Sequence, residues 1–344
     1  MSFAIFVVSN ESGILTKMSK NEFILKPTRM LTHPHTTRSR LMLEVASQLV
    51  NRKDFPYLQA RIDLREQGAD EWPLTLFASD SPATIHEVAA GKVQFAIINP
   101  SMILKLAALG SAPFKEPIPL RIIAVLPALD QMVFAVNRES GLKSFSDIRE
   151  RKYPLRVSLR RQPDHSLHVI TDHVFKAAGF SLDDIVSWGG NVRYDDGMPY
   201  GANRIGAVQR GEVEAIFDEG ASAWGNMALE LGMTFLTLDD VILQRVEAVG
   251  LRRAVIEKRY FPKLSADVPT LDFSGWPIYT HENTSDAFVT DFCRALEASK
   301  ERIPWAQAAP LPLAQMVRDT PEGHLEVPLH PAAERYWRER EYLP

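Results

Sequence analysis

Two arginines and two carboxylates stand where apolar stretches of the sequence end. Arg160 and Arg161 directly follow an expected strand over residues 155–159, and a guanidinium group can hold a carboxylate through paired hydrogen bonds. Asp218 and Glu219 end a second apolar run, in GEVEAIFDEG. The pattern predicts a binding site in which Arg160, the arginine nearer the strand, holds an anion. The two acids then either receive a ligand ammonium or neutralise the arginines in the empty protein.

A helix is expected to begin near Ser166, shortly after the two arginines. The free amides of a helix N-terminus carry partial positive charge, so Ser166 is a further candidate for contact with an anion. The plainer alternative for this region is a solvated loop with one arginine in an ion pair. For the acids, the plainer alternative is an ordinary acidic turn.

The acidic run has a counterpart in the first half of the chain. AAGKVQFAIINPS and QRGEVEAIFDEGA share one pattern of helix end, glycine, apolar strand, polar tip and new helix, with Gly91 and Gly211 standing 120 positions apart. Glycine suits a helix C-terminus, and ligands of open α/β sheets bind beyond the carboxyl ends of the strands. Asn99 and Ser101 at the first tip are therefore expected to line a cleft between two lobes. Helix capping alone would also explain Ser101.

Histidines and catalytic motifs do not indicate a second site. His165, His168 and Asp172 share one helical face, and His33 and His35 lie earlier in the chain, but no known metal motif has this spacing. The sequence has no G-x-S-x-G, no G-x-x-x-x-G-K and no G-x-G-x-x-G after a strand. We expect no metal, no cofactor and no catalytic residue.

The composition is that of an ordinary globular protein. Of 344 residues, 45% are hydrophobic and 24% are charged, and the net charge of −4 argues against a nucleic-acid partner. The single Cys293 excludes an internal disulfide and suits a small buried residue. The first residues lack the basic region and the long apolar core of a secretory leader. The chain as written is expected to be cytoplasmic, or periplasmic if the true start carries a leader.

Strands and helices alternate along the chain, which predicts an α/β fold with parallel sheets. Expected strands include residues 120–126, 132–136 and 185–188, and expected helices include residues 40–50 and one that begins near Ala221.

The domain organisation is inferred from a break in the strand pattern near residue 130 and from the scarcity of strand signals after about residue 245. Residues 1–22 are an N-terminal extension. Residues 23–130 together with 246–344 form lobe 1, and residues 131–245 form lobe 2.

Several short motifs, in this order and at this spacing, point to a known family. GKVQFAIINPS, PLRIIAVLP, GEVEAIFDEGA and LHPAAERYWRE together resemble the TAXI family of solute receptors of TRAP transporters, which belongs to the type II periplasmic binding protein superfamily. The resemblance implies two α/β lobes, joined by two hinge strands, that close on a small and usually carboxylate-bearing solute.

The resemblance also implies further ligand contacts and shows three departures, the first of which is the missing leader peptide. Thr36 and Thr37 stand where the family's first loop meets the solute, and Gln131 lies at the hinge, where a structural turn is the alternative. The glycine-rich first loop of the family is replaced here by THPHTTRSR, and the serine- and glycine-rich loop of the second lobe is replaced by RRQPDHS. The resemblance therefore predicts the fold more firmly than the solute.

The sequence predicts a solute-binding receptor for an anionic or zwitterionic, amino-acid-like metabolite, with TRAP membrane subunits as candidate partners. One alternative is a cytosolic decarboxylase similar to 4,5-dihydroxyphthalate decarboxylase, in which Arg160 and Arg161 hold a carboxylate. Another is a cytosolic sensor of the same ligand. A thiamine-pyrimidine synthase is disfavoured because that related family carries a cysteine cluster, which this sequence lacks.

Overall fold

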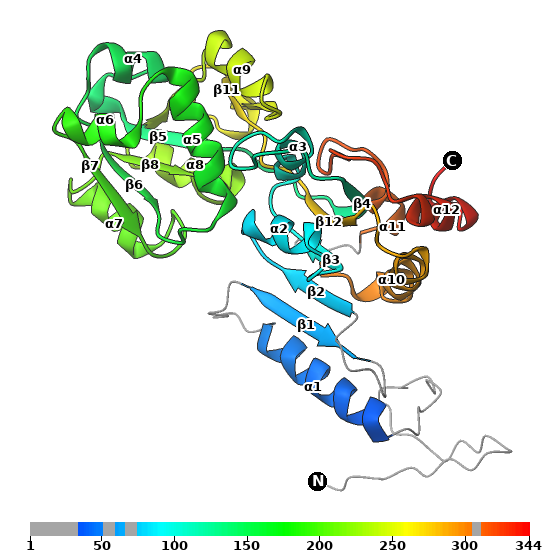
Figure 1. The fold of residues 1–344 in the computed structure, drawn as a ribbon. Coiled ribbons are helices and arrows are strands. Elements are labelled where there is room, and N and C mark those ends of the chain that lie inside the picture. Colours follow the sequence, from blue (N-terminus) through cyan, green and yellow to red (C-terminus); the bar gives the residue numbers. More distant parts are fainter. Residues whose placement is uncertain (1–33, 51–58, 66–73, 305–310) are drawn as a thin grey trace, which may run out of the picture. The chain divides into compact units, whose positions relative to one another are not determined.

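The computed structural model describes residues 34–50, 59–65, 74–304 and 311–344 (Figure 1). The chain divides into two units, Met1–Tyr57 and Leu58–Pro344, and each is described by itself. The predicted N-terminal extension, residues 1–22, lies outside the described residues.

The first unit contains helix α1 (Pro34–Val50). The helix begins at Pro34 rather than near residue 40, since proline is tolerated in a first turn, where its missing N–H would have no partner. Thr36 and Thr37 therefore lie at the start of a helix and not in the predicted loop. Leu41, Val45 and Leu49, predicted as one apolar face, have exposed side chains.

The first sheet of the second unit has the strand order β1-β2-β3-β12-β4. Its strands are β1 (Ala60–Leu64), β2 (Leu74–Ala78), β3 (Phe95–Ile97), β4 (Leu120–Leu126) and β12 (Trp276–His281). β2 and β3 are parallel, whereas β12 runs antiparallel to both of its neighbours. The helices of this lobe are α2 (Ala83–Ala89), α3 (Met102–Leu109), α10 (Asp286–Ala298), α11 (Leu313–Met316) and α12 (Pro331–Glu339).

The second sheet has the strand order β7-β6-β8-β5-β9. Its strands are β5 (Val133–Asn137), β6 (Arg156–Arg160), β7 (Asn191–Asp195), β8 (Ala215–Asp218) and β9 (Met233–Phe235). β6 is parallel to β7 and β8, whereas β5 is antiparallel to both of its neighbours. The helices of this lobe are α4 (Phe145–Glu150), α5 (Ser166–Ala178), α6 (Leu182–Ser187), α7 (Ala202–Gln209), α8 (Ala221–Glu230) and α9 (Asp240–Glu247).

Each sheet contains one strand that the chain adds directly after crossing from the other sheet. β5 enters the second sheet after β4, and β12 enters the first sheet after the chain returns. The two crossing segments touch at the bridge between Gln131 and Asp272. This exchange confirms the predicted α/β fold of two lobes joined by two hinge segments.

A two-stranded ladder, β10 (Arg253–Ile256) with β11 (Val268–Leu271), precedes the return crossing. Ile256 and Val268 share a core cluster with Val133 of the second lobe. The predicted lobe boundary at residue 246 is therefore followed by a segment that still packs against the second sheet.

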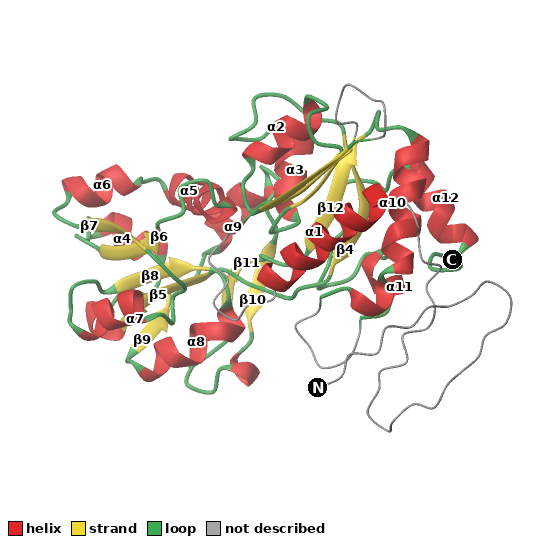
Figure 2. Ribbon diagram, turned by 90° about the horizontal axis from the view of Figure 1, so that it is seen from below, coloured by secondary structure: helices red, strands yellow, loops and turns green. Residues whose placement is uncertain are grey.

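Alternate residues of the second sheet pack against helices on its two faces, because successive strand side chains point to opposite sides. Phe134 and Leu159 share a cluster with residues of α5 such as Ile170, whereas Val133 packs with Trp224 of α8. Figure 2 shows α5 and α8 on opposite faces of this sheet. This sandwich fixes the ends of β6 and β8, where the polar side chains gather.

The predicted strand over residues 185–188 is wrong. Ser181 and Asp184 form a capping box in which each side chain accepts a hydrogen bond from the other's backbone N–H, and helix α6 follows. A capping box satisfies two N–H groups at a helix start and so favours the helix over a strand.

Candidate functional site

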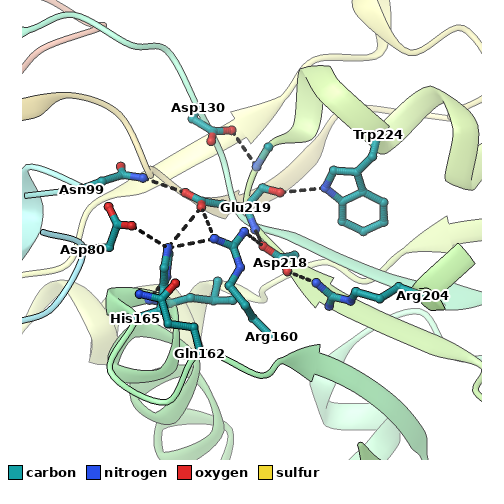
Figure 3. A network of polar contacts seen from close by, with 12 residues as sticks. Asp80, Asn99, Asp130, Arg160, Gln162, His165, Arg204, Asp218, Glu219 and Trp224 are labelled. Carbon is teal, nitrogen blue, oxygen red and sulfur yellow. Dashed lines mark hydrogen bonds and ion pairs between the residues drawn. The ribbon is translucent and has the colours of Figure 1, made fainter. Parts of the chain in front are cut away.

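Arg160 is the last residue of β6, and its guanidinium group lies between two carboxylates (Figure 3). Its Nη2 lies 2.5 Å from Asp218 Oδ1, and its Nη1 lies 3.0 Å from Glu219 Oε1. The Arg160 side chain is 12% exposed. The strand end thus holds a partly buried arginine at the position where the sequence predicted an anion contact.

Asp218 is fixed from two sides at the end of β8. Its side chain is fully buried and accepts hydrogen bonds from Arg160 and from Arg204 of α7. Arg204 is itself fully buried and also donates to the hydroxyl and the carbonyl of Ser158, both at 3.1 Å. Burial raises the pKa of Asp218, but the two arginines outweigh it and hold the pKa below its usual range. Asp218 is therefore the permanent counterion of this arginine pair.

Glu219 is held less firmly and reaches the other lobe. Asn99 Nδ2 donates to its Oε2 at 3.0 Å, and Trp224 Nε1 donates to its backbone carbonyl at 2.7 Å. Burial is the main cause that raises the pKa of Glu219 to about 8. The positive charge of Arg160 lowers this pKa, and the nearby carboxylates Asp130 and Asp218 oppose Arg160 by raising it. Glu219 is therefore the titratable acid of the site.

The bond between Asn99 and Glu219 joins the two tips that the sequence comparison paired. Each residue follows the strand of a unit that consists of a helix, a glycine and a strand. The two residues stand 120 positions apart. A second link lies nearby, where the backbone N–H and the hydroxyl of Ser166 donate to the carbonyl of Asp80 at 3.0 and 2.8 Å. Contacts from both lobes thus converge on the carboxyl ends of β3, β6 and β8.

Asp130 lies in the segment that crosses from β4 to β5, next to the acidic tip formed by Asp218 and Glu219. Its Oδ1 accepts hydrogen bonds from the backbone N–H groups of Gln131, Gly220 and Ala221 at 2.7 to 3.2 Å. Burial nevertheless raises the pKa of Asp130 to about 7. This carboxyl ties the hinge to the start of α8 and adds negative charge next to Glu219.

His165 lies against Arg160 and caps helix α5. Its Nδ1 accepts a hydrogen bond from the Leu167 N–H at 3.1 Å, and its Nε2 lies 2.8 Å from Arg160 Nη1 and 3.5 Å from Glu219 Oε1. Burial and the positive charge of Arg160 lower the pKa of His165 to about 3, so the imidazole is neutral. A neutral ring accepts at only one nitrogen. The Leu167 N–H and Arg160 Nη1 are both donors, so they compete for that one acceptor nitrogen.

Three buried polar atoms of the cluster have no hydrogen-bond partner among the residues that the structure describes. They are Asn99 Oδ1, Arg160 Nε and Gln162 Nε2. Buried polar atoms are seldom left unpaired, so such atoms point to a missing partner. Here they offer one acceptor and two donors to a bound molecule.

The remaining predicted residues lie elsewhere. Arg161 is exposed and pairs with Asp196 at 3.2 Å. Ser101 is buried and donates to the carbonyl of Ser274 at 2.9 Å, and Gln131 is held in the hinge bridge. Thr36 and Thr37 belong to the first unit, which is described by itself.

The structure therefore brings together five of the predicted residues, Asn99, Arg160, Ser166, Asp218 and Glu219. It adds Arg204 and Gln162, which no sequence pattern indicated. It also adds His165, for which the sequence pattern raised only the possibility of a metal ligand.

Two searches of the described residues bear on other functions. No group of three or more His, Cys, Asp or Glu side chains is placed to hold a metal ion within these residues. In the same part of the chain, no helix has both the length and the apolar character that a membrane span needs.

Comparison with curated proteins finds no match to this sequence. Among solved structures, the alkanesulfonate-binding protein SsuA from Xanthomonas axonopodis pv. citri, bound to MOPS, is 15% identical, with 77% of this chain and 71% of that chain covered and a TM-score of 0.30. An ABC-transporter choline binding protein in complex with choline is 14% identical, with 58% of each chain covered and a TM-score of 0.34.

The substrate binding protein of an amino acid ABC transporter is 14% identical, with 72% of this chain and 91% of that chain covered and a TM-score of 0.27. A family model matches residues 78–340, which include both sheets from the end of β2 onward and every residue of the cluster around Arg160. The chain belongs to the NMT1-like family.

Proposed function

We propose that this protein is a solute-binding receptor that closes its two lobes on a small metabolite carrying a carboxylate, either anionic or zwitterionic. The observation that carries the proposal is the position of Arg160. It is a partly buried arginine at the end of β6, beside the point where Asn99 of one lobe meets Glu219 of the other.

The contacts between the lobes supply the mechanism. A ligand that touches both lobes stabilises the closed state by the difference between its affinities for the closed and open states. In two-lobe proteins such closure takes place about a few hinge residues. Here the hinge contains the Gln131 and Asp272 bridge, and Asp130 connects it to the acidic tip. Binding at Arg160 is thus coupled to the hinge through short contacts.

The carboxylate is inferred from the arginine and the unpaired donors around it. Arginine binds carboxylates through parallel N–H bonds. The buried Arg160 Nε and Gln162 Nε2 supply donors that no described residue uses. The unpaired Asn99 Oδ1 supplies an acceptor for a donor group of the same ligand.

We further propose that the receptor serves a TRAP-type transporter as a TAXI-like protein, with the membrane subunits reading the closed state. This role implies a periplasmic location. Cell fractionation of the native host, with an antibody against this chain, tests the location independently of the ligand.

Native mass spectrometry of the gently purified protein, followed by denaturing extraction, tests the binding function. A single carboxylate or amino acid released intact is the expected result. An empty protein, or a bound molecule that changes chemically on incubation, contradicts the receptor and points to the decarboxylase alternative.

A further inference from the structure

Arg160 has two carboxylate partners, and only one of them is firmly held. Asp218 is fully buried and engaged by Arg204 as well as Arg160. Glu219 is held by Arg160 and by Asn99 of the other lobe, with His165 beside it. The Glu219 carboxylate therefore occupies the contact of Arg160 that is easier to exchange.

The charges of the cluster limit what can bind at Arg160. Arg160 and Arg204 balance Asp218 and Glu219 when both acids are ionised. A ligand carboxylate at Arg160 would then add a third negative charge to two positive ones. A buried charge without a partner is strongly unfavourable. Asp130 lies next to Glu219 as a fourth carboxylic group, so more than one of these groups must be neutral in the bound state.

Of the two acids that contact Arg160, Glu219 is the one that the surroundings allow to be neutral. Asp218 lies between two arginines, which hold its pKa low. Glu219 is faced by Arg160 from β6, His165 from the start of α5, Asp218 from β8 and Asp130 from the crossing segment. Together with burial, the two carboxylates raise its pKa to about 8. Asp80 of the first lobe also faces His165, with its Oδ2 4.0 Å from His165 Nε2.

Asn99 can serve both forms of Glu219. Its Nδ2 donates to the Glu219 carboxylate at 3.0 Å, while its buried Oδ1 has no partner among the described residues. If the amide turns over, Oδ1 accepts the O–H of a protonated Glu219. The first lobe thus provides a partner for the neutral acid without moving the backbone.

We propose that Glu219 is the specificity-determining counterion of Arg160: a ligand carboxylate takes its contact with the guanidinium, and Glu219 remains beside Asn99 as the neutral acid. This inference rests on the proposed function. It implies that each carboxylate bound at Arg160 requires one proton on Glu219.

Calorimetric titrations test this coupling with acetate, pyruvate, L-lactate and benzoate, which have no other group that titrates between pH 6 and 10. For any of these that binds, the affinity of the wild-type protein should fall about tenfold per pH unit above about pH 8 and much less steeply below it. In that upper range, the dependence of the binding enthalpy on buffer ionisation should report the uptake of one proton per ligand.

Glu219→Gln mimics the neutral acid, and its affinity should lack the tenfold fall per pH unit above about pH 8. Glu214→Gln is the matched control, because Glu214 is a partly buried acid of the same lobe that bonds Tyr153 and the Arg156 N–H instead. It should follow the wild-type profile.

A wild-type affinity that stays flat to pH 10, or binding without proton uptake above pH 8, overturns the inference while leaving the proposed function standing. These two wild-type measurements decide the matter even if Glu219→Gln does not fold. Failure of all four carboxylates to bind either protein overturns the carboxylate part of the proposed function, and this inference with it.

Discussion

The two strand tips that meet in the site share a position in the fold and differ in chemistry. Asn99 follows β3 in the first lobe, and Glu219 follows β8 in the second, 120 positions later. The first tip brings a neutral amide. The second brings two acids that already engage Arg160, one of which also engages Arg204. One lobe therefore holds the buried charges, and the other adds a neutral hydrogen bond where the two lobes meet.

The largest effect is expected from Arg204 in the charged lobe. Arg204→Met removes one partner of a fully buried ion pair and leaves Asp218 with Arg160 alone. Breaking such a pair costs about 3 to 5 kcal/mol, so urea titration should show a loss of stability of that order. Arg210→Met is the control, because Arg210 and its partner Glu212 are both exposed and surface pairs contribute about 0 to 1 kcal/mol. Equal losses in the two variants would contradict the assignment of the buried charges to Arg204 and Asp218.

The second effect concerns stability and pH. The pKa of Glu219 is about 8 in the folded protein, above its ordinary value of 4.5, so the folded state retains a proton that the unfolded state releases. Stability from this group is present below about pH 4.5 and is lost as pH rises to about 8. Relative to Glu219→Gln, the wild-type protein should lose on the order of a few kcal/mol across this window in denaturant titrations. A constant difference between the two proteins would show that Glu219 has an ordinary pKa.

The smallest effect is expected from the neutral tip. Asn99→Ala removes one hydrogen bond to Glu219 and one unpaired acceptor, and a net hydrogen bond contributes about 1 kcal/mol. Ligand affinity should fall roughly fivefold in calorimetry, with little change in the melting temperature. A loss as large as that of an Arg160 variant would mean that the first lobe also carries a main anchor.

Much of this arrangement could be predicted because its signals are local. Gly91 and Gly211, with the apolar runs that follow them, indicated two strands ending in polar tips, and the structure has β3 and β8 there. The strand before Arg160 was equally local, so the arginine was placed at a strand end from sequence alone.

The rest depends on pairing between distant elements or on competing local signals. Nothing in α7 indicates that Arg204 is buried against Asp218, because that contact depends on which helix covers the end of β8. Arg161 differs from Arg160 only by the alternation at the strand end, which turns it outward to Asp196. Residues 185–188 predict a strand wrongly because a short apolar run does not distinguish strand from helix, whereas the capping box of Ser181 favours the helix.

The most direct test of the account compares these two adjacent arginines in calorimetry, using the molecule identified by native mass spectrometry. Arg160→Ala should weaken binding by about 2 to 5 kcal/mol, as expected when a buried charged contact is truncated. Arg161→Ala, which removes an exposed arginine of the same loop, should bind like the wild-type protein. Unchanged affinity in Arg160→Ala, or equal losses in both variants, would contradict a binding site centred on Arg160.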